Sequence, residues 1–113
     1  MVLEYIEKTV AAIQSAGVEA RRAFPAEKMP HLTELFATVS IYKASQSSVA
    51  LLVTVYAPVT KGGNACEDGA VTIARALEAL GGQWKIGSCS FESKAGVFAL
   101  PVEVTYPGVG AAR

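Results

Sequence analysis

The chain has 113 residues, with 10 Lys plus Arg and 10 Asp plus Glu, so its formal net charge is zero. This length predicts one domain over residues 1–113, and the charge balance excludes a general binder of nucleic acid or anionic membranes, which would carry a basic excess. Charged residues make up only 18% of the chain and hydrophobic residues 51%, which predicts a core that needs no metal or disulfide and a subunit that forms oligomers.

The first predicted element is an amphipathic helix over residues 2–16. Apolar residues recur at intervals of three and four positions and share one helix face, namely Leu3, Ile6, Val10 and Ile13. Gly17 stands where a glycine commonly ends a helix. This face is expected to cover a sheet.

A short strand over residues 18–24 follows and ends at Pro25. Successive side chains of a strand point to opposite faces. We therefore expect Arg21 to be exposed, and Arg22 to lie on the same side as Val18 and Phe24, where it needs a partner.

Two long strands separated by a polar turn predict an antiparallel hairpin. The first, over residues 32–43, alternates, with Leu35, Ala37, Val39 and Ile41 expected on one face and Glu34, Phe36, Thr38, Ser40 and Tyr42 on the other. The second, over residues 49–56, is rich in β-branched residues and apolar on both faces. That composition is typical of a central strand.

A second helix is predicted after the flexible segment 61–63. Asn64 is placed to cap it, and Gly81 and Gly82 are placed to end it. The face expected to be buried consists of Cys66, Ala70, Ile73, Leu77 and Leu80.

Two strands, over residues 83–91 and 96–106, are predicted to close the domain, with residues 107–113 as a frayed tail. Pro101 has no N–H to donate, so the last strand should lie at an edge or carry a bulge there. The order α-β-β-β-α-β-β predicts an α+β two-layer sandwich, in which two helices cover a mostly antiparallel sheet. The connection from residue 49 to residue 91 is the expected place of the one parallel pair.

Residues suited to catalysis or metal binding are few. His31 lies in a loop without the partner that a general base needs or the further ligands that a metal needs. Cys66 and Cys89 are interpreted as reduced thiols that pack in the interior. The sequence therefore predicts no enzyme, no catalytic residue, no metal site and no cofactor.

The chain lacks the features of a secreted or membrane protein. Residues 1–17 have neither the basic region nor the unbroken apolar region of a signal peptide. The longest apolar stretch, residues 49–57, falls short of the roughly 20 residues that a membrane span needs. We expect a soluble protein made in the cytoplasm that does not bind membranes.

Four residues are candidates for a contact between subunits. Arg and Trp are enriched at protein interfaces, and a strand edge marked by proline is open to a neighbour. The candidates are Arg21, Arg22, Trp84 and Pro101. For Trp84, a position in the core remains an equal alternative.

The order of elements and two segments resemble the tail terminator proteins of long-tailed phages and prophages. The first segment, LLVTVYAPVTKGGNACEDGAVTIARAL at residues 51–77, reads as a buried strand, a loop with a glycine pair and an Ala-rich helix. The second, CSFESKAGVFALPVEVTY at residues 89–106, is similar to the closing hairpin of such proteins. The resemblance covers about residues 3–106.

The resemblance implies a structural protein of the virion, assembled in the host cytoplasm. Such proteins form a hexameric ring that caps the tail tube and offers a surface to the head. The implied partners are further copies of the chain, the tail tube protein and the head–tail connector proteins. No cofactor is implied, and we expect no sequence-specific contact with nucleic acid.

Two other interpretations remain open. The chain can be a neighbouring head–tail completion or minor capsid protein, or a small oligomeric ligand-binding or regulatory α+β module that dimerises through its sheet. A ring in solution or on tube ends favours a virion protein, whereas a dimer that binds a metabolite favours the module.

Overall fold

The computed structural model describes residues 2–23, 33–44 and 48–107. The elements in chain order are α1 (Val2–Ser15), β1 (Glu19–Arg22), β2 (Phe36–Ala44), β3 (Ser48–Pro58), α2 (Gly62–Glu78), β4 (Gln83–Ile86), β5 (Ser90–Glu92) and β6 (Val97–Pro107). The predicted α+β class and element order are confirmed, except that the strand predicted over residues 83–91 is divided into β4 and β5.

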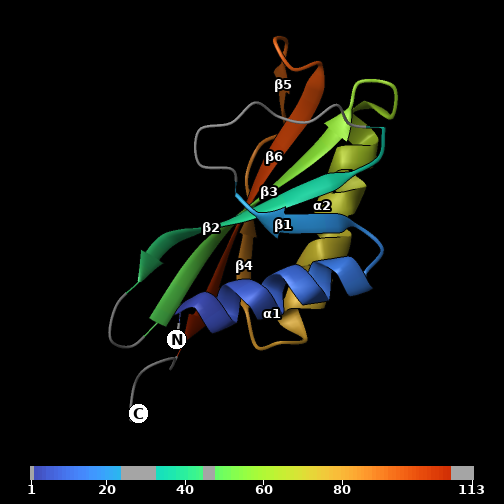
Figure 1. The fold of residues 1–113 in the computed structure, drawn as a ribbon. Helices are drawn as coiled ribbons and strands as arrows, with labels where there is room; N and C mark the ends of the chain where they lie inside the picture. The colour runs from blue at the N-terminus through green and yellow to red at the C-terminus, as the bar shows by residue number, and fades with distance from the viewer. Residues whose placement is uncertain (1, 24–32, 45–47, 108–113) are drawn as a thin grey trace.

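The strands form one sheet in the order β1-β2-β3-β6-β4, and β5 pairs with β6 beyond the end of β4 (Figure 1). β2 and β3 form the predicted antiparallel hairpin, and β3 also pairs antiparallel with β6. Among the described strands, the one parallel pair is β1 with β2. The prediction of a parallel pair across the connection from β3 through α2 to β4 was wrong, because β6 lies between those two strands.

Both helices pack on the same face of the sheet and against each other (Figure 1). Alternate residues of β3 and β6 supply the buried apolar side chains of this face: Val49, Leu51, Val53, Val55, Leu100, Val102, Val104 and Tyr106. The helices bury Ile6, Ile13, Cys66, Ala70, Ile73 and Leu77 against them. Because burial of one such side chain stabilises a fold by about 1.5–3 kcal/mol, this two-layer contact is the core.

Both ends of α2 differ from those predicted from the sequence. The N-cap residue is Lys61, and no side chain caps the helix, so Asn64 lies within the first turn. The helix ends at Glu78, and the chain then turns through Gly81, whose φ is 88°. Leu80 therefore lies past the last turn and is 43% exposed instead of buried.

The turn after α2 approaches the core closely at Gly82. A Cβ atom at this position would lie 2.6 Å from Cγ2 of Val104 and 3.0 Å from the backbone oxygen of Leu77. Only glycine lets the chain pass this point without displacing the core, so Gly82 determines where β4 enters the sheet.

β2 has different surroundings along its length. Residues 36–39 pair with β1 on one side and β3 on the other, and they are buried. The register shifts between Ile41 and Lys43, and residues 41–44 are exposed beyond the end of β1. Ile41, predicted to share a face with Ala37 and Val39, is 54% exposed although those two residues are buried, because β1 ends before it reaches this part of the strand.

An edge or a bulge was predicted at Pro101, and the edge alternative was wrong because β6 is a central strand. β4 pairs with residues 102–105 and β5 with residues 97–99 of β6, which leaves Pro101 at the break between them. The Gly87 N–H donates to the Pro101 carbonyl at 2.8 Å. The backbone N and C=O of one strand residue point to the same side, so the nitrogen of Pro101 also points toward this break. Because this nitrogen carries no hydrogen, only the Gly87 carbonyl lacks a hydrogen-bond donor from β6.

The two leucines at the end of α2 provide a test of the core. Leu77→Ala should lower the free energy of unfolding by about 2–5 kcal/mol, because the Leu77 side chain is fully buried. Leu80→Ala, the matched control, should lower it by less than about 1 kcal/mol, because Leu80 is exposed. Denaturant titration measures both changes. Equal losses of unfolding free energy would contradict the placement of Leu80 outside the core.

Candidate interaction surfaces

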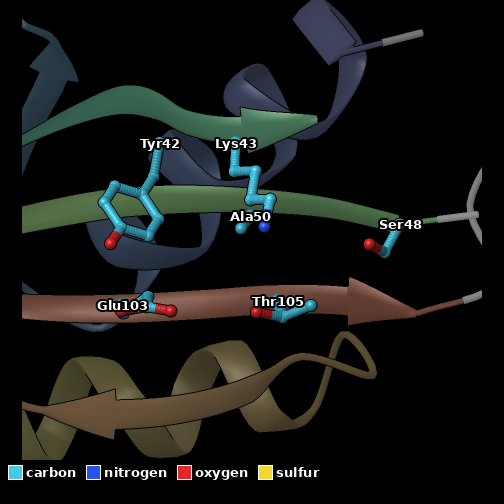
Figure 2. Close-up of a pocket in the computed structure, with 6 residues that line it drawn as sticks. All are labelled: Tyr42, Lys43, Ser48, Ala50, Glu103 and Thr105. Carbon is cyan, nitrogen blue, oxygen red and sulfur yellow. The ribbon is translucent and has the colours of Figure 1, made fainter. Parts of the chain in front are cut away.

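The sheet face opposite the helices carries polar and half-buried side chains. Within residues 2–23, 33–44 and 48–107, no helix covers it. A hollow near one end of this face is lined by Tyr42, Lys43, Ser48, Ala50, Glu103 and Thr105. Figure 2 shows that these side chains come from three neighbouring strands, β2, β3 and β6. One cation, one carboxylate and three hydroxyls are typical of the polar rim of a protein contact surface.

The four predicted interface residues fall in three places. Arg21 and Arg22 are both exposed in β1, at one edge of the sheet. Trp84 is exposed in β4, at the opposite edge. Pro101 lies half-buried within the sheet and lines a second, smaller hollow on the helix-free face. The structure thus brings the two arginines together and separates them from Trp84 and Pro101.

The arginines of β1 differ in their contacts. The Arg21 guanidinium lies 5.2 Å from the centre of the Phe36 ring, so Arg21 helps to cover a buried aromatic side chain. Arg22 was predicted to share the buried side of Val18, but it is exposed. The reason is that β1 is an edge strand that ends at this residue and buries only Ala20.

Trp84 lies at the border of the core, where a hydrogen bond fixes its side chain. Its indole Nε1–H donates to Oε2 of Glu78 at 2.8 Å, while its ring remains 40% exposed. In the ladder, Trp84 lies opposite the buried Val104. The residue therefore contacts the core and presents a large apolar surface at the edge of the sheet.

Sequence reasoning missed three exposed apolar residues on the projecting strands. Ile41 and Tyr42 lie in the part of β2 that extends past β1, and Phe91 lies in β5 with its ring 5.3 Å from that of Phe98. Alternation indicates the face on which such a residue lies. It gives no sign of the lengths of the neighbouring strands, so nothing in the sequence marked these residues as exposed.

The cysteines do not form a reactive site. Cys66 is fully buried, and its thiol donates to the Val55 carbonyl at 3.4 Å. Burial, with smaller contributions from Cys89 and Glu67, raises the pKa of the Cys66 thiol to about 12, so the thiol stays protonated at neutral pH. Cys89 is a free, half-buried thiol.

Tyr106 is a second buried group with a shifted pKa. Its hydroxyl lies 2.9 Å from Oγ1 of Thr9, so the two hydroxyls satisfy each other inside the core. Burial raises the pKa of Tyr106, although the hydrogen bond with Thr9 opposes the shift. This pair links α1 to β6 and is structural.

Metal-binding clusters and membrane-spanning helices are two further features of interest. Within the described ranges, no group of three or more His, Cys, Asp or Glu side chains is placed to hold a metal ion. His31 lies outside the described residues. No helix in the described part of the chain is long and apolar enough to cross a membrane.

Comparison with protein-family models found no match, and a search of curated proteins found no significant similarity. A function for this chain therefore has to be inferred from the sheet edges and the helix-free face.

The state of Cys66 can be tested by alkylation. In the folded protein, Cys66 should react with iodoacetamide far more slowly than Cys89 from about pH 7 to about pH 9, because the thiolate is the reactive form and a pKa of about 12 suppresses it. Peptide mass spectrometry measures the labelling of each residue. In denaturant both cysteines should react, and equal labelling in the native state would contradict the burial of Cys66.

Proposed function

We propose that this protein is a structural subunit of a phage tail, a terminator that closes into a ring on the end of the tail tube and joins the tube to the head. The observation that carries the proposal is the position of interaction residues on two opposite edges of one sheet, with Arg21 and Arg22 on one and Trp84 on the other. The element order on which the resemblance to tail terminators rests is also the order in the folded chain.

A ring needs two different contact surfaces on each subunit. In such heterologous contacts, one face of a subunit meets a different face of the next, and the chain closes if the rotation between copies allows it. Two edges with unlike side chains satisfy this requirement. The zero net charge leaves little repulsion between copies.

The two ends of the sheet supply the remaining surfaces. β2 ends and β3 begins at the end of the sheet where Ser48 pairs with Pro107, and the turn between β5 and β6 lies at the other end, where Pro58 pairs with Val97 (Figure 1). Each end carries an exposed aromatic residue, Tyr42 at the first and Phe91 at the second. With the strands along the ring axis, one end contacts the tube protein and the other the head–tail connector.

The test uses tail tubes polymerised from the tube protein of the same genome. Wild-type protein should form rings on tube ends in negative-stain images and stop further tube growth. Arg22→Glu should abolish the rings and change the free energy of unfolding by only about 0.5 kcal/mol, because Arg22 is exposed at an edge. Arg21 is a poorer probe, because a change there also removes its contact with Phe36.

The control for charge reversal is Arg75→Glu, at an exposed position of α2 and not in either edge strand. This variant should cap tubes as the wild type does. Capping by Arg22→Glu would place the contact on another surface. Absence of wild-type protein from tube ends would overturn the terminator proposal, and a dimer that binds a metabolite would favour the regulatory module instead.

A further inference from the structure

The two edges of the sheet carry opposite charges without ionic partners in the subunit. In the described part of the chain, the one ion pair joins Lys61 to Glu34. Arg22 on the β1 edge and Glu78 beside the β4 edge therefore have no ionic partner among these residues, and both side chains are exposed. A cation on one edge and a carboxylate near the other suit a contact between two copies of the chain.

The Glu78 carboxylate is held in place by the tryptophan of β4. The Nε1–H of Trp84 donates to Oε2 of Glu78 at 2.8 Å, which fixes the carboxylate and the ring relative to each other. The other carboxylate oxygen, Oε1, accepts no hydrogen bond from a described residue, and the Trp84 side chain is 40% exposed. A carboxylate beside an aromatic ring suits a guanidinium, which donates through its edge and stacks through its face.

The pairing of the strands places Arg22 and Trp84 on the same face of the sheet. One row of paired residues contains Arg22, Val39, Val53, Val102 and Ile86. The next row on this face contains Ile41, Leu51, Val104 and Trp84. The helices cover the middle of both rows, so Arg22 and Trp84 lie on the helix-covered side at opposite edges, one row apart.

Rotation about an axis parallel to the strands brings these two edges together. Such a rotation moves no residue along the axis, so Arg22 of one copy meets the next copy at the level of Ile86, which ends the same row. Trp84 lies one row away, about 6.8 Å along the strand for two residues. The Arg22 side chain, with three methylene groups before its guanidinium, spans this step.

We propose that Arg22 of one subunit binds the Glu78–Trp84 pair of the next subunit in the ring. The guanidinium donates to Oε1 of Glu78 and covers the exposed part of the Trp84 ring. Every subunit supplies both halves of the contact, one at each edge, as a heterologous ring requires. The contact uses side chains alone and leaves the strand pairing of each subunit unchanged. The inference rests on the proposed ring and names its subunit contact.

The other cations of the two edge strands lie on the opposite face. Arg21 pairs with Thr38 in the ladder and extends over the Phe36 ring, so it points away from the helix-covered side. Lys85 lies opposite Glu103 on that same helix-free face. Arg22 is therefore the edge-strand cation that the Glu78 carboxylate of a neighbour can meet.

The first measurement follows self-association without tail tubes. Trp84 is the only tryptophan of the chain, so its emission monitors this contact. As the concentration rises, wild-type protein should form species larger than dimers in sedimentation velocity, and the emission should shift to shorter wavelength because Arg22 displaces water from the ring. Added salt should weaken both effects. Wild-type protein that stays monomeric up to about 1 mM, or that stops at a dimer, would overturn the contact.

Charge exchange identifies the two partners. Arg22→Glu and Glu78→Arg should each weaken association by at least about tenfold, because like charges then meet. Both substitutions in one chain restore opposite charges and should recover association. An equimolar mixture of the two single variants should also recover it, since the two proteins can alternate around the assembly. Failure of both recoveries would overturn the pairing of Arg22 with Glu78.

Two further variants separate the contact from folding and from net charge. Glu78→Gln keeps an oxygen that accepts from Trp84, so the melting temperature should stay within about 3 °C, whereas association should fall about tenfold. The matched control, Glu67→Arg, reverses an exposed charge about 16 Å from Glu78 along α2 and should associate as the wild type does. Equal losses in Glu67→Arg and Glu78→Arg would overturn the contact.

The contact and the proposed function can fail separately. Tubes capped by the wild type, with no recovery by charge exchange, would remove this contact and keep the terminator role. Recovery in solution, with tube ends left bare by the wild type, would keep the contact and remove the terminator role.

Discussion

The packing of both helices on one face of the β3–β6 pair is the contact on which the rest of the structure depends. Each of these strands has 11 residues, and their alternate side chains form one continuous apolar face. The hydrogen bond between Tyr106 and Thr9 satisfies two hydroxyls inside this contact, where an unpaired polar group would cost about 1–3 kcal/mol. Since α1 and α2 both lie on this side, the opposite face and the sheet edges are left for other contacts.

The candidate interaction residues lie around the rim of the fold. Arg22 and Ile41 lie on one side of the sheet and Trp84 on the other, and the exposed Tyr42 and Phe91 lie toward the two ends. The rim arises because β1 and β4 have 4 residues each and are shorter than the strands they flank. A subunit that contacts neighbours on two sides and other proteins at two ends needs this distribution. The proposed ring follows from it.

Several positions show where sequence patterns stop being informative. Leu77 and Leu80 both fit the apolar face of the predicted helix, yet only Leu77 is buried, because α2 ends at Glu78. Pro101 was expected at an edge or at a bulge, but a proline also fits a central strand where the neighbouring strand is broken. The arginines and Trp84 could be proposed as interface residues from their types alone. Ile41 could not, because its exposure depends on the length of β1.

The amino-acid sequence by itself determined the α+β class, the order of the elements apart from the division of β4 from β5, and the buried face of α2 apart from Leu80. These properties follow from periodicities of 3.6 and 2 residues, which act along the chain. Only the tertiary structure decided that β6 is central, that β1 pairs parallel with β2, and that Trp84 and Ile41 end the same row on opposite edges. The reason is that strand order and strand overlap are set by contacts between distant segments, which no local pattern encodes.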